Sequence, residues 1–179
     1  MNKIVATHHI LFITLDALRY DVASQAFNKG LLTNFSAILP AEGWEERHTP
    51  GNFTFSAHQA FFAGFLPTPV DNPRAPRLFA TRFSGSETTT ATTFVFDQPD
   101  IVSGFKAEGF HTICIGGVGF FNGQSPLGQV LPGLFEQSYW QRSFGVTDRD
   151  SARNQFSFAA SKIRELGTHG KTFLFINIS

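Results

Sequence analysis

The chain has 179 residues, a length that suits one domain with a substantial core. Its 14 basic and 14 acidic residues balance, so we expect no nucleic-acid or anionic-membrane partner. The one cysteine, Cys114, excludes an intrachain disulfide and a cysteine metal cluster. The N-terminal residues contain no apolar stretch of the length that a secretory signal or a membrane span needs, and we expect a cytoplasmic protein.

Phenylalanine is unusually frequent, with 22 copies against two tyrosines and two tryptophans. Such large apolar rings need burial. Two arrangements satisfy this need: a core built mainly of phenylalanine, or an apolar surface that meets a partner.

The first half of the chain predicts one strand and two helical segments. Residues 9–15 form an apolar run of strand length that ends at Asp16. Residues 21–39 carry apolar side chains at helical spacing, with an interruption at Gly30. Residues 54–65 predict a short helix.

The second half repeats an order of helix, then strand. Residues 99–108 predict a helix that Asp100 opens and Gly109 ends, and residues 110–115 predict the strand that follows. A glycine-rich turn occupies residues 116–119.

The last segments complete this alternation. Residues 122–145 are rich in Gly, Pro and Gln and predict an irregular segment, residues 150–166 predict an amphipathic helix, and residues 171–178 predict a buried strand. The pattern predicts an α/β fold whose mostly parallel sheet is flanked by helices on both faces. Ligands of such sheets bind beyond the carboxyl ends of the strands, which is where Asp16 and the glycine turn fall.

Asp16 ends a strand that is otherwise apolar. A carboxylate in this place must be ion-paired, hydrogen-bonded or bound to a metal, because an isolated buried charge is very costly. It could be a metal ligand, a turn or N-cap residue of the next helix, or the ion-pair partner of Arg19.

Thr54 begins a predicted helix, and the free N–H groups and positive dipole end of a helix favour an anion. A hydroxyl in that position can attack a phosphoryl group that the helix end holds, although threonine is also an ordinary N-cap residue. His58 lies four residues later on the same face. It could contact the same anion or be a surface histidine.

Four segments occur in this order along the chain: LFITLDALRYD, TFSAHQAFFAGFLP, DIVSGFKAEGFHTICIGG and KTFLFINIS. Together they resemble the alkaline phosphatase/sulfatase-like superfamily. The first is similar to its first strand and metal-binding aspartate, the second to its nucleophile helix, and the last two to two later blocks. The resemblance implies that residues 1–179 are a single α/β domain, the N-terminal part of a sulfatase-like hydrolase fold that is truncated before the remaining metal ligands.

The resemblance also implies roles for particular residues. Thr54 takes the position of the nucleophile and Asp16 that of a metal ligand, with the Thr54 hydroxyl on the same cation. Asn52 and His58 lie where they would offset charge on the phosphoryl oxygens. The implied cofactor is a divalent metal, zinc above all, with one or two ions in a complete protein.

Several positions depart from the sulfatase pattern. Sulfatases need Cys or Ser where this chain has Thr54, and threonine is the nucleophile of the phosphodiesterase and transferase branches. Gly117 and Gly119 replace the lysine and histidine that hold sulfate, and Ala17 replaces a second metal-binding aspartate. We therefore expect a hydrolase or transferase that acts on small-molecule phosphate esters.

Two other functions compete with this expectation. The protein could be a catalytically incomplete sulfatase-like protein that acts by binding a partner. Its partner could be a second copy of the chain or the later half of the fold, supplied separately. A nucleotide-binding domain that uses the turn at 116–119 is disfavoured, because no clear helix follows that turn.

Overall fold

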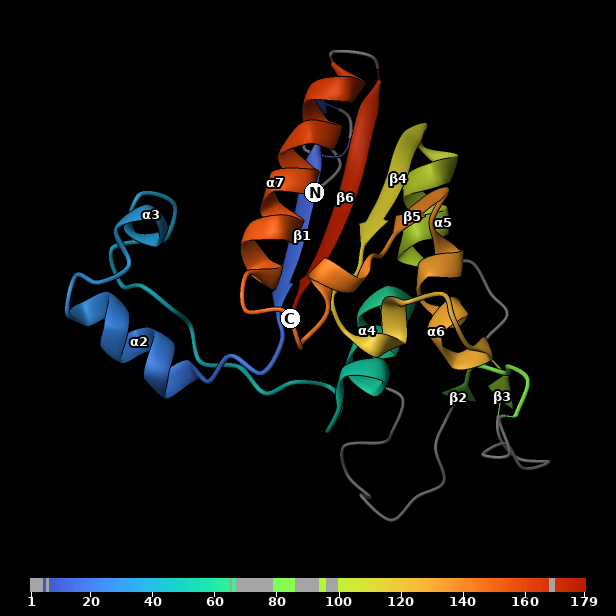
Figure 1. Ribbon diagram of the computed structural model, residues 1–179, viewed down its shortest axis with the longest axis horizontal. Coiled ribbons are helices and arrows are strands. Elements are labelled where there is room, and N and C mark those ends of the chain that lie inside the picture. Colours follow the sequence, from blue (N-terminus) through green and yellow to red (C-terminus); the bar gives the residue numbers. More distant parts are fainter. Residues whose placement is uncertain are drawn as a thin grey trace.

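The computed structural model describes residues 5, 7–64, 66, 79–85, 94–95, 100–167 and 170–179. Within these residues a parallel sheet of four strands has the order β1-β6-β4-β5 (Figure 1). The strand bounds are β1 Ile10–Leu15, β4 Phe110–Ile115, β5 Gln137–Tyr139 and β6 Lys171–Ile178. A separate parallel pair consists of β2 Phe79–Ala80 and β3 Phe94–Val95.

Helices cover both faces of the sheet, as the sequence predicts (Figure 1). The helix bounds are α2 Tyr20–Asn28, α3 Thr33–Ser36, α4 Thr54–Ala63, α5 Ile101–Ala107, α6 Pro126–Val130 and α7 Ser151–Leu166, with 3-10 turns η1 Gly119–Phe121, η2 Pro132–Leu134 and η3 Arg142–Phe144. None of the helices in the described ranges is long and apolar enough to span a bilayer.

The central strand β6 supplies side chains to two separate cores. Successive side chains of a strand point to opposite faces. Phe173 and Phe175 therefore pack with residues of α4 and α5, whereas Leu174 and Ile176 pack with residues of α7. Pairing on both edges buries every β6 residue after Lys171.

Phenylalanine builds the core on the side of α4 and α5. Seven of the ten buried residues in that cluster are phenylalanines: Phe55, Phe62, Phe110, Phe121, Phe135, Phe173 and Phe175. The ring of Phe175 is fully buried, and its centroid lies 5.1 to 5.8 Å from those of Phe62, Phe121 and Phe135. The first of the two expected arrangements, a phenylalanine core, is therefore the one that forms here.

Local sequence signals explain most element boundaries. Asp100 caps α5, because its carboxylate accepts a hydrogen bond from the Ser103 amide at 2.9 Å. Gly30 and Gly109 have φ angles of 68° and 78°, which glycine adopts without steric cost. The prediction of an irregular segment over 122–145 is wrong in part, because α6 and β5 lie within it. A strand of three residues is too short to produce a recognisable alternation.

Helices α2 and α3 extend away from the sheet (Figure 1). The predicted helical segment forms with its interruption at Gly30, but it does not pack its apolar residues on the sheet. Val22, Leu31 and Ile38 are 54%, 69% and 76% exposed.

Replacing Phe175 by Ala should lower the free energy of unfolding by about 3–5 kcal/mol, because it leaves a cavity where several rings meet. Chemical denaturation followed by circular dichroism measures this change. The matched control is Phe156→Ala on the outer face of α7, where the ring is 42% exposed; here we expect a loss below about 1 kcal/mol. Equal losses in the two variants would contradict the proposed core.

Candidate active site

Asp16 extends the β1–β6 ladder by one residue and then leaves it. Its amide donates a hydrogen bond to the Ile178 carbonyl at 2.9 Å. The Leu18 amide donates to the Leu15 carbonyl at 3.3 Å, and Ala17 between them has a φ of 61°. A positive φ at the third residue of such a turn is typical of type II turns. The turn carries the chain away from the sheet and leaves the Asp16 side chain at its carboxyl edge.

The hydroxyl of Thr54 meets the carboxylate of Asp16. Thr54 Oγ1 donates to Asp16, with distances of 3.1 Å to Oδ2 and 3.3 Å to Oδ1. Thr54 is the first residue of α4, whereas the N-cap is Phe53, which makes no capping hydrogen bond with its side chain. The prediction that Thr54 is the N-cap residue of this helix is therefore wrong. The prediction that Asp16 forms an ion pair with Arg19 is wrong as well, because Arg19 pairs with Asp21 at the surface.

His58 is buried beneath this pair and is 4% exposed, so it is not a surface histidine. Its Nδ1 lies 2.7 Å from the Thr54 carbonyl oxygen, and its Nε2 lies 3.0 Å from Thr14 Oγ1. A carbonyl oxygen only accepts, so Nδ1 carries the ring proton and Nε2 accepts from the Thr14 hydroxyl. The rings of Phe61, Phe121 and Phe175 surround the imidazole at 5.3–5.6 Å between centroids.

Asn177 connects this histidine to the carboxylate. Its side chain is fully buried near the end of β6, opposite Thr14 in the β1–β6 register. Nδ2 donates to Thr14 Oγ1 and to Asp16 Oδ2, both at 3.2 Å, and Oδ1 accepts from the Val118 amide at 3.2 Å. His58, Thr14, Asn177 and Asp16 thus form one continuous hydrogen-bonded chain.

The end of β6 is held from the other face of the sheet by Gln155 of α7. This side chain is fully buried. Its Nε2 donates to the Asn177 carbonyl at 2.6 Å, and its Oε1 accepts from the Ser179 amide at 3.4 Å. Helix α7 therefore fixes the backbone from which the Asn177 side chain projects.

An open pocket of about 530 Å³ lies over the Asp16–Thr54 pair. All four residues that the sequence singled out line this pocket: Asp16, Asn52, Thr54 and His58. Contact of Asn52 or His58 with a bound anion stays a prediction. Both ring nitrogens of His58 already have partners, which gives this residue a role in positioning that the sequence did not suggest.

The first turn of α4 borders the pocket through Thr54 and Ala57. Its first helical hydrogen bond runs from the Ala57 amide to the Phe53 carbonyl, so the amides that precede Ala57 have no partner within the helix. Gly51 packs against this turn, and a Cβ there would lie 2.6 Å from the Ala57 nitrogen. Only glycine lets the preceding loop approach the helix end so closely.

Close packing also explains the glycines of the turn after β4. A Cβ on Gly117 would lie 2.6 Å from the Asn177 carbonyl oxygen, and a Cβ on Gly116 would overlap the Phe121 side chain. Neither glycine has a positive φ. These two glycines therefore let the turn pack on the end of β6 and on η1.

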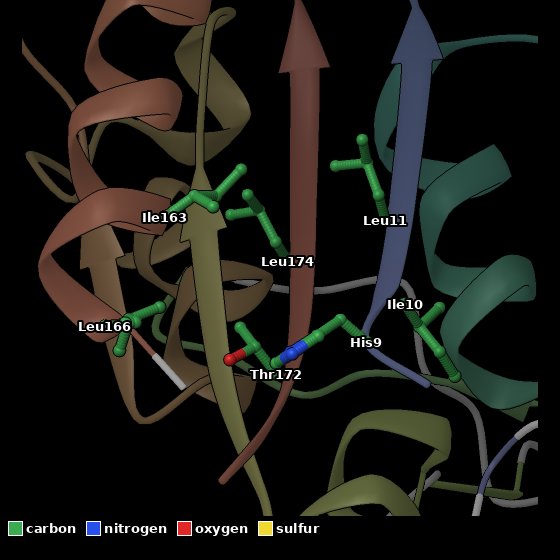
Figure 2. A pocket seen from close by; sticks show the side chains of 8 residues that line it. His9, Ile10, Leu11, Ile163, Leu166, Thr172 and Leu174 are labelled. Atoms are coloured by element: carbon green, nitrogen blue, oxygen red, sulfur yellow. The ribbon is translucent and has the colours of Figure 1, made fainter. Parts of the chain in front are cut away.

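Figure 2 shows a different pocket, near the amino ends of β1 and β6. It has a volume of about 180 Å³, and its walls include Leu11 of β1, Leu174 of β6 and two residues of α7, Ile163 and Leu166. These walls are apolar and present no carboxylate. It is therefore a poor candidate for phosphoryl chemistry.

Few residues in the described part of the chain could bind a metal ion at this pocket. No group of three or more His, Cys, Asp or Glu side chains with metal-binding geometry occurs there. Asp16 and Thr54 nevertheless present a carboxylate and a hydroxyl to the same pocket. Oxygen ligands of this kind suit divalent cations.

Comparisons with known proteins found no relative. No model of a known protein family matches the chain, and neither a curated protein nor a solved structure does.

Burial of His58 should make folding depend on pH. Burial lowers the pKa of the imidazole, against the opposing effects of the Thr54 carbonyl and the Asp16 charge. Below about pH 6.5 the unfolded chain binds a proton at this ring more readily than the folded protein does. Stability should therefore fall as the pH falls from 7.5 to the lowered pKa. Urea denaturation across this range measures the effect.

The matched variant is His58→Asn, which cannot take up that proton. We expect its free energy of unfolding to vary less with pH than that of the wild type between about pH 7.5 and 5. Parallel profiles for the two proteins would show that His58 is not held neutral by burial.

Proposed function

We propose that the protein is a metal-dependent hydrolase or transferase that acts on small-molecule phosphate esters in the cytoplasm. In this proposal Thr54 is the nucleophile and Asp16 binds a divalent cation, for which zinc is the favoured metal. The proposal rests chiefly on the 3.1 Å contact between Thr54 Oγ1 and Asp16 Oδ2 in an open pocket. These residues lie 38 positions apart, and the resemblance to the alkaline phosphatase/sulfatase-like superfamily assigns them to a shared site.

A cation would be held by the Asp16 carboxylate and the Thr54 hydroxyl, and the remaining ligands would come from outside this pair. When bound, it would lower the pKa of the hydroxyl and neutralise charge on the phosphoryl oxygens. Asn177 and Thr54 both donate to the Asp16 carboxylate, whose two oxygens still offer a further lone pair to a cation.

In this proposal Thr54 acts as a nucleophile in two steps. In the first, its hydroxyl gives up its proton to solvent and its oxygen bonds to phosphorus, while the bond from phosphorus to the leaving oxygen breaks and that oxygen takes a proton from solvent, so that a phosphothreonine forms. Amides at the start of α4 hold the phosphoryl oxygens during this displacement. In the second step, water hydrolyses the phosphothreonine, or an acceptor hydroxyl takes the phosphoryl group in a transferase.

A binding protein without catalytic activity is the second candidate. The apolar residues Val22, Leu31 and Ile38, which α2, α3 and the neighbouring residues expose, favour it. In that case a partner protein, a second copy of this chain or a separate later half of the fold would cover these residues.

Thr54→Ala should abolish hydrolysis of bis(p-nitrophenyl) phosphate in the presence of Zn²⁺, with a loss of at least about 10³-fold in kcat, because it removes the nucleophilic hydroxyl. Thr54→Ser keeps the hydroxyl and should retain part of the activity. Absorbance of released p-nitrophenolate measures the rate.

Thr33 offers a matched control for this substitution. Like Thr54 it is the first residue of a helix, but it lies in α3 and is exposed. Thr33→Ala should leave the rate unchanged. A Thr54→Ala protein that turns over at the wild-type rate would remove the nucleophile from the proposal.

Asn177→Ala should weaken Zn²⁺ binding about 10–100-fold, because the Asp16 carboxylate would lose the donor that orients it. Titration calorimetry measures the affinity, and thermal denaturation of the same sample shows whether the variant is folded. A folded Asn177→Ala protein with wild-type affinity would show that Asn177 does not position the ligand.

A further inference from the structure

A second pocket of about 480 Å³ lies at the same edge of the sheet, beyond β4 and β5. Gly117 follows β4 in sequence and Trp140 follows β5, so both lie at carboxyl ends of strands. Its lining residues include Gly117, Gly119, Gln124, Trp140, Arg142 and Thr147. Neither the nucleophile nor the proposed metal ligand lines it.

One residue near the end of β6, Asn177, makes hydrogen bonds beside both pockets. Asn177 donates to Asp16 in the first pocket and accepts from Val118, the neighbour of Gly117 in the second. Strands β1 and β4 pair with opposite edges of β6. Neighbouring strands are about 4.8 Å apart, so the carboxyl ends of β1 and β4, beside which the two pockets lie, are separated by roughly 10 Å.

Arg142 gives the second pocket its charge. It is the charged side chain among the residues that line the pocket, and it is exposed at the start of η3. Within the described residues its guanidinium forms no salt bridge. Trp140 forms a fixed wall beside it, because the indole N–H donates to the Gly117 carbonyl at 3.2 Å.

Gly119 lines the second pocket without a side chain. Its φ is not positive, and the nearest atom to a Cβ built on it is Asn122 Nδ2 at 3.9 Å. Neither backbone conformation nor close packing therefore requires glycine here, in contrast to Gly117. A larger residue at this position of the lining is therefore a conservative way to reduce the pocket.

We propose that this second pocket binds an anionic group of the substrate, such as a carboxylate or a second phosphate, roughly 10 Å from the ester that Thr54 attacks. Arg142 pairs with this group, and Gly119 leaves room for it. The proposal rests on the proposed function, because it assumes that the substrate's phosphoryl group occupies the pocket of Asp16 and Thr54.

Two phosphonates that are not hydrolysed provide the test. Hexane bisphosphonate carries a phosphonate at each end of a six-carbon chain, and hexylphosphonate has the same chain with one phosphonate. Calorimetry with the Zn²⁺-loaded protein should give an affinity at least about tenfold higher for the bisphosphonate. Asp16→Asn should weaken binding of both compounds, because each places one phosphonate in the first pocket.

Arg142→Gln and Gly119→Leu should each remove the advantage of the bisphosphonate and leave hexylphosphonate binding unchanged. The matched controls are Arg149→Gln, which removes an exposed arginine outside the pocket, and Gly133→Leu, where a Cβ meets no atom within 4 Å. Both controls should keep the advantage.

The other outcomes separate the two claims. Hexylphosphonate binding that needs Asp16, together with no advantage for the bisphosphonate or an advantage that survives Arg142→Gln, would overturn the second pocket and leave the proposed function standing. If neither compound binds, or if Asp16→Asn leaves the affinity unchanged, the proposed function is contradicted, and so is the proposal for the second pocket.

Discussion

Burial of the Asn177 amide constrains the whole carboxyl edge of the sheet. An amide in an apolar interior is costly unless its donors and its acceptor are hydrogen-bonded. Asn177 meets this requirement with three partners from two segments: Thr14 and Asp16 at the end of β1, and Val118 after β4. These hydrogen bonds hold the two segments together and position the carboxylate that faces Thr54.

The phenylalanine core on one face of the sheet supports this polar chain. Close packing around Phe175 buries the imidazole of His58. A neutral imidazole is the form that such surroundings favour, and it can accept from Thr14 while it donates to the Thr54 carbonyl. The start of α4, and with it the Thr54 hydroxyl, is thereby tied to the strand that carries the carboxylate.

The sequence predicted the strands and helices with strong patterns, together with the convergence of Asp16 and Thr54. Long apolar runs, the Asp100 cap and the glycines at helix ends are local signals, so they can be read without a structure. It missed β5, which is too short for a periodic pattern. It also missed Asn177, although a polar residue within the apolar run 171–178 is a signal that could have been followed.

Other features depend on tertiary contacts that no local pattern contains. The sequence could not show that α2 and α3 lie away from the sheet, because an amphipathic pattern does not reveal whether its apolar side is covered. It could not show that His58 is buried either, since that depends on the rings of Phe121 and Phe175 from two other segments of the chain. Gly117 and Gly119 look alike in the sequence, and only their surroundings show that the first is needed for packing and the second leaves space.

The shared site of Asp16 and Thr54 is tested most directly by a crystal structure of the protein with Zn²⁺, with anomalous diffraction recorded at the zinc absorption edge. The account predicts an anomalous peak about 2.0–2.2 Å from an Asp16 carboxylate oxygen, with the Thr54 hydroxyl facing the same ion. A structure in which the two side chains point to separate surfaces, or in which zinc binds elsewhere and leaves this pocket without a peak, would contradict it.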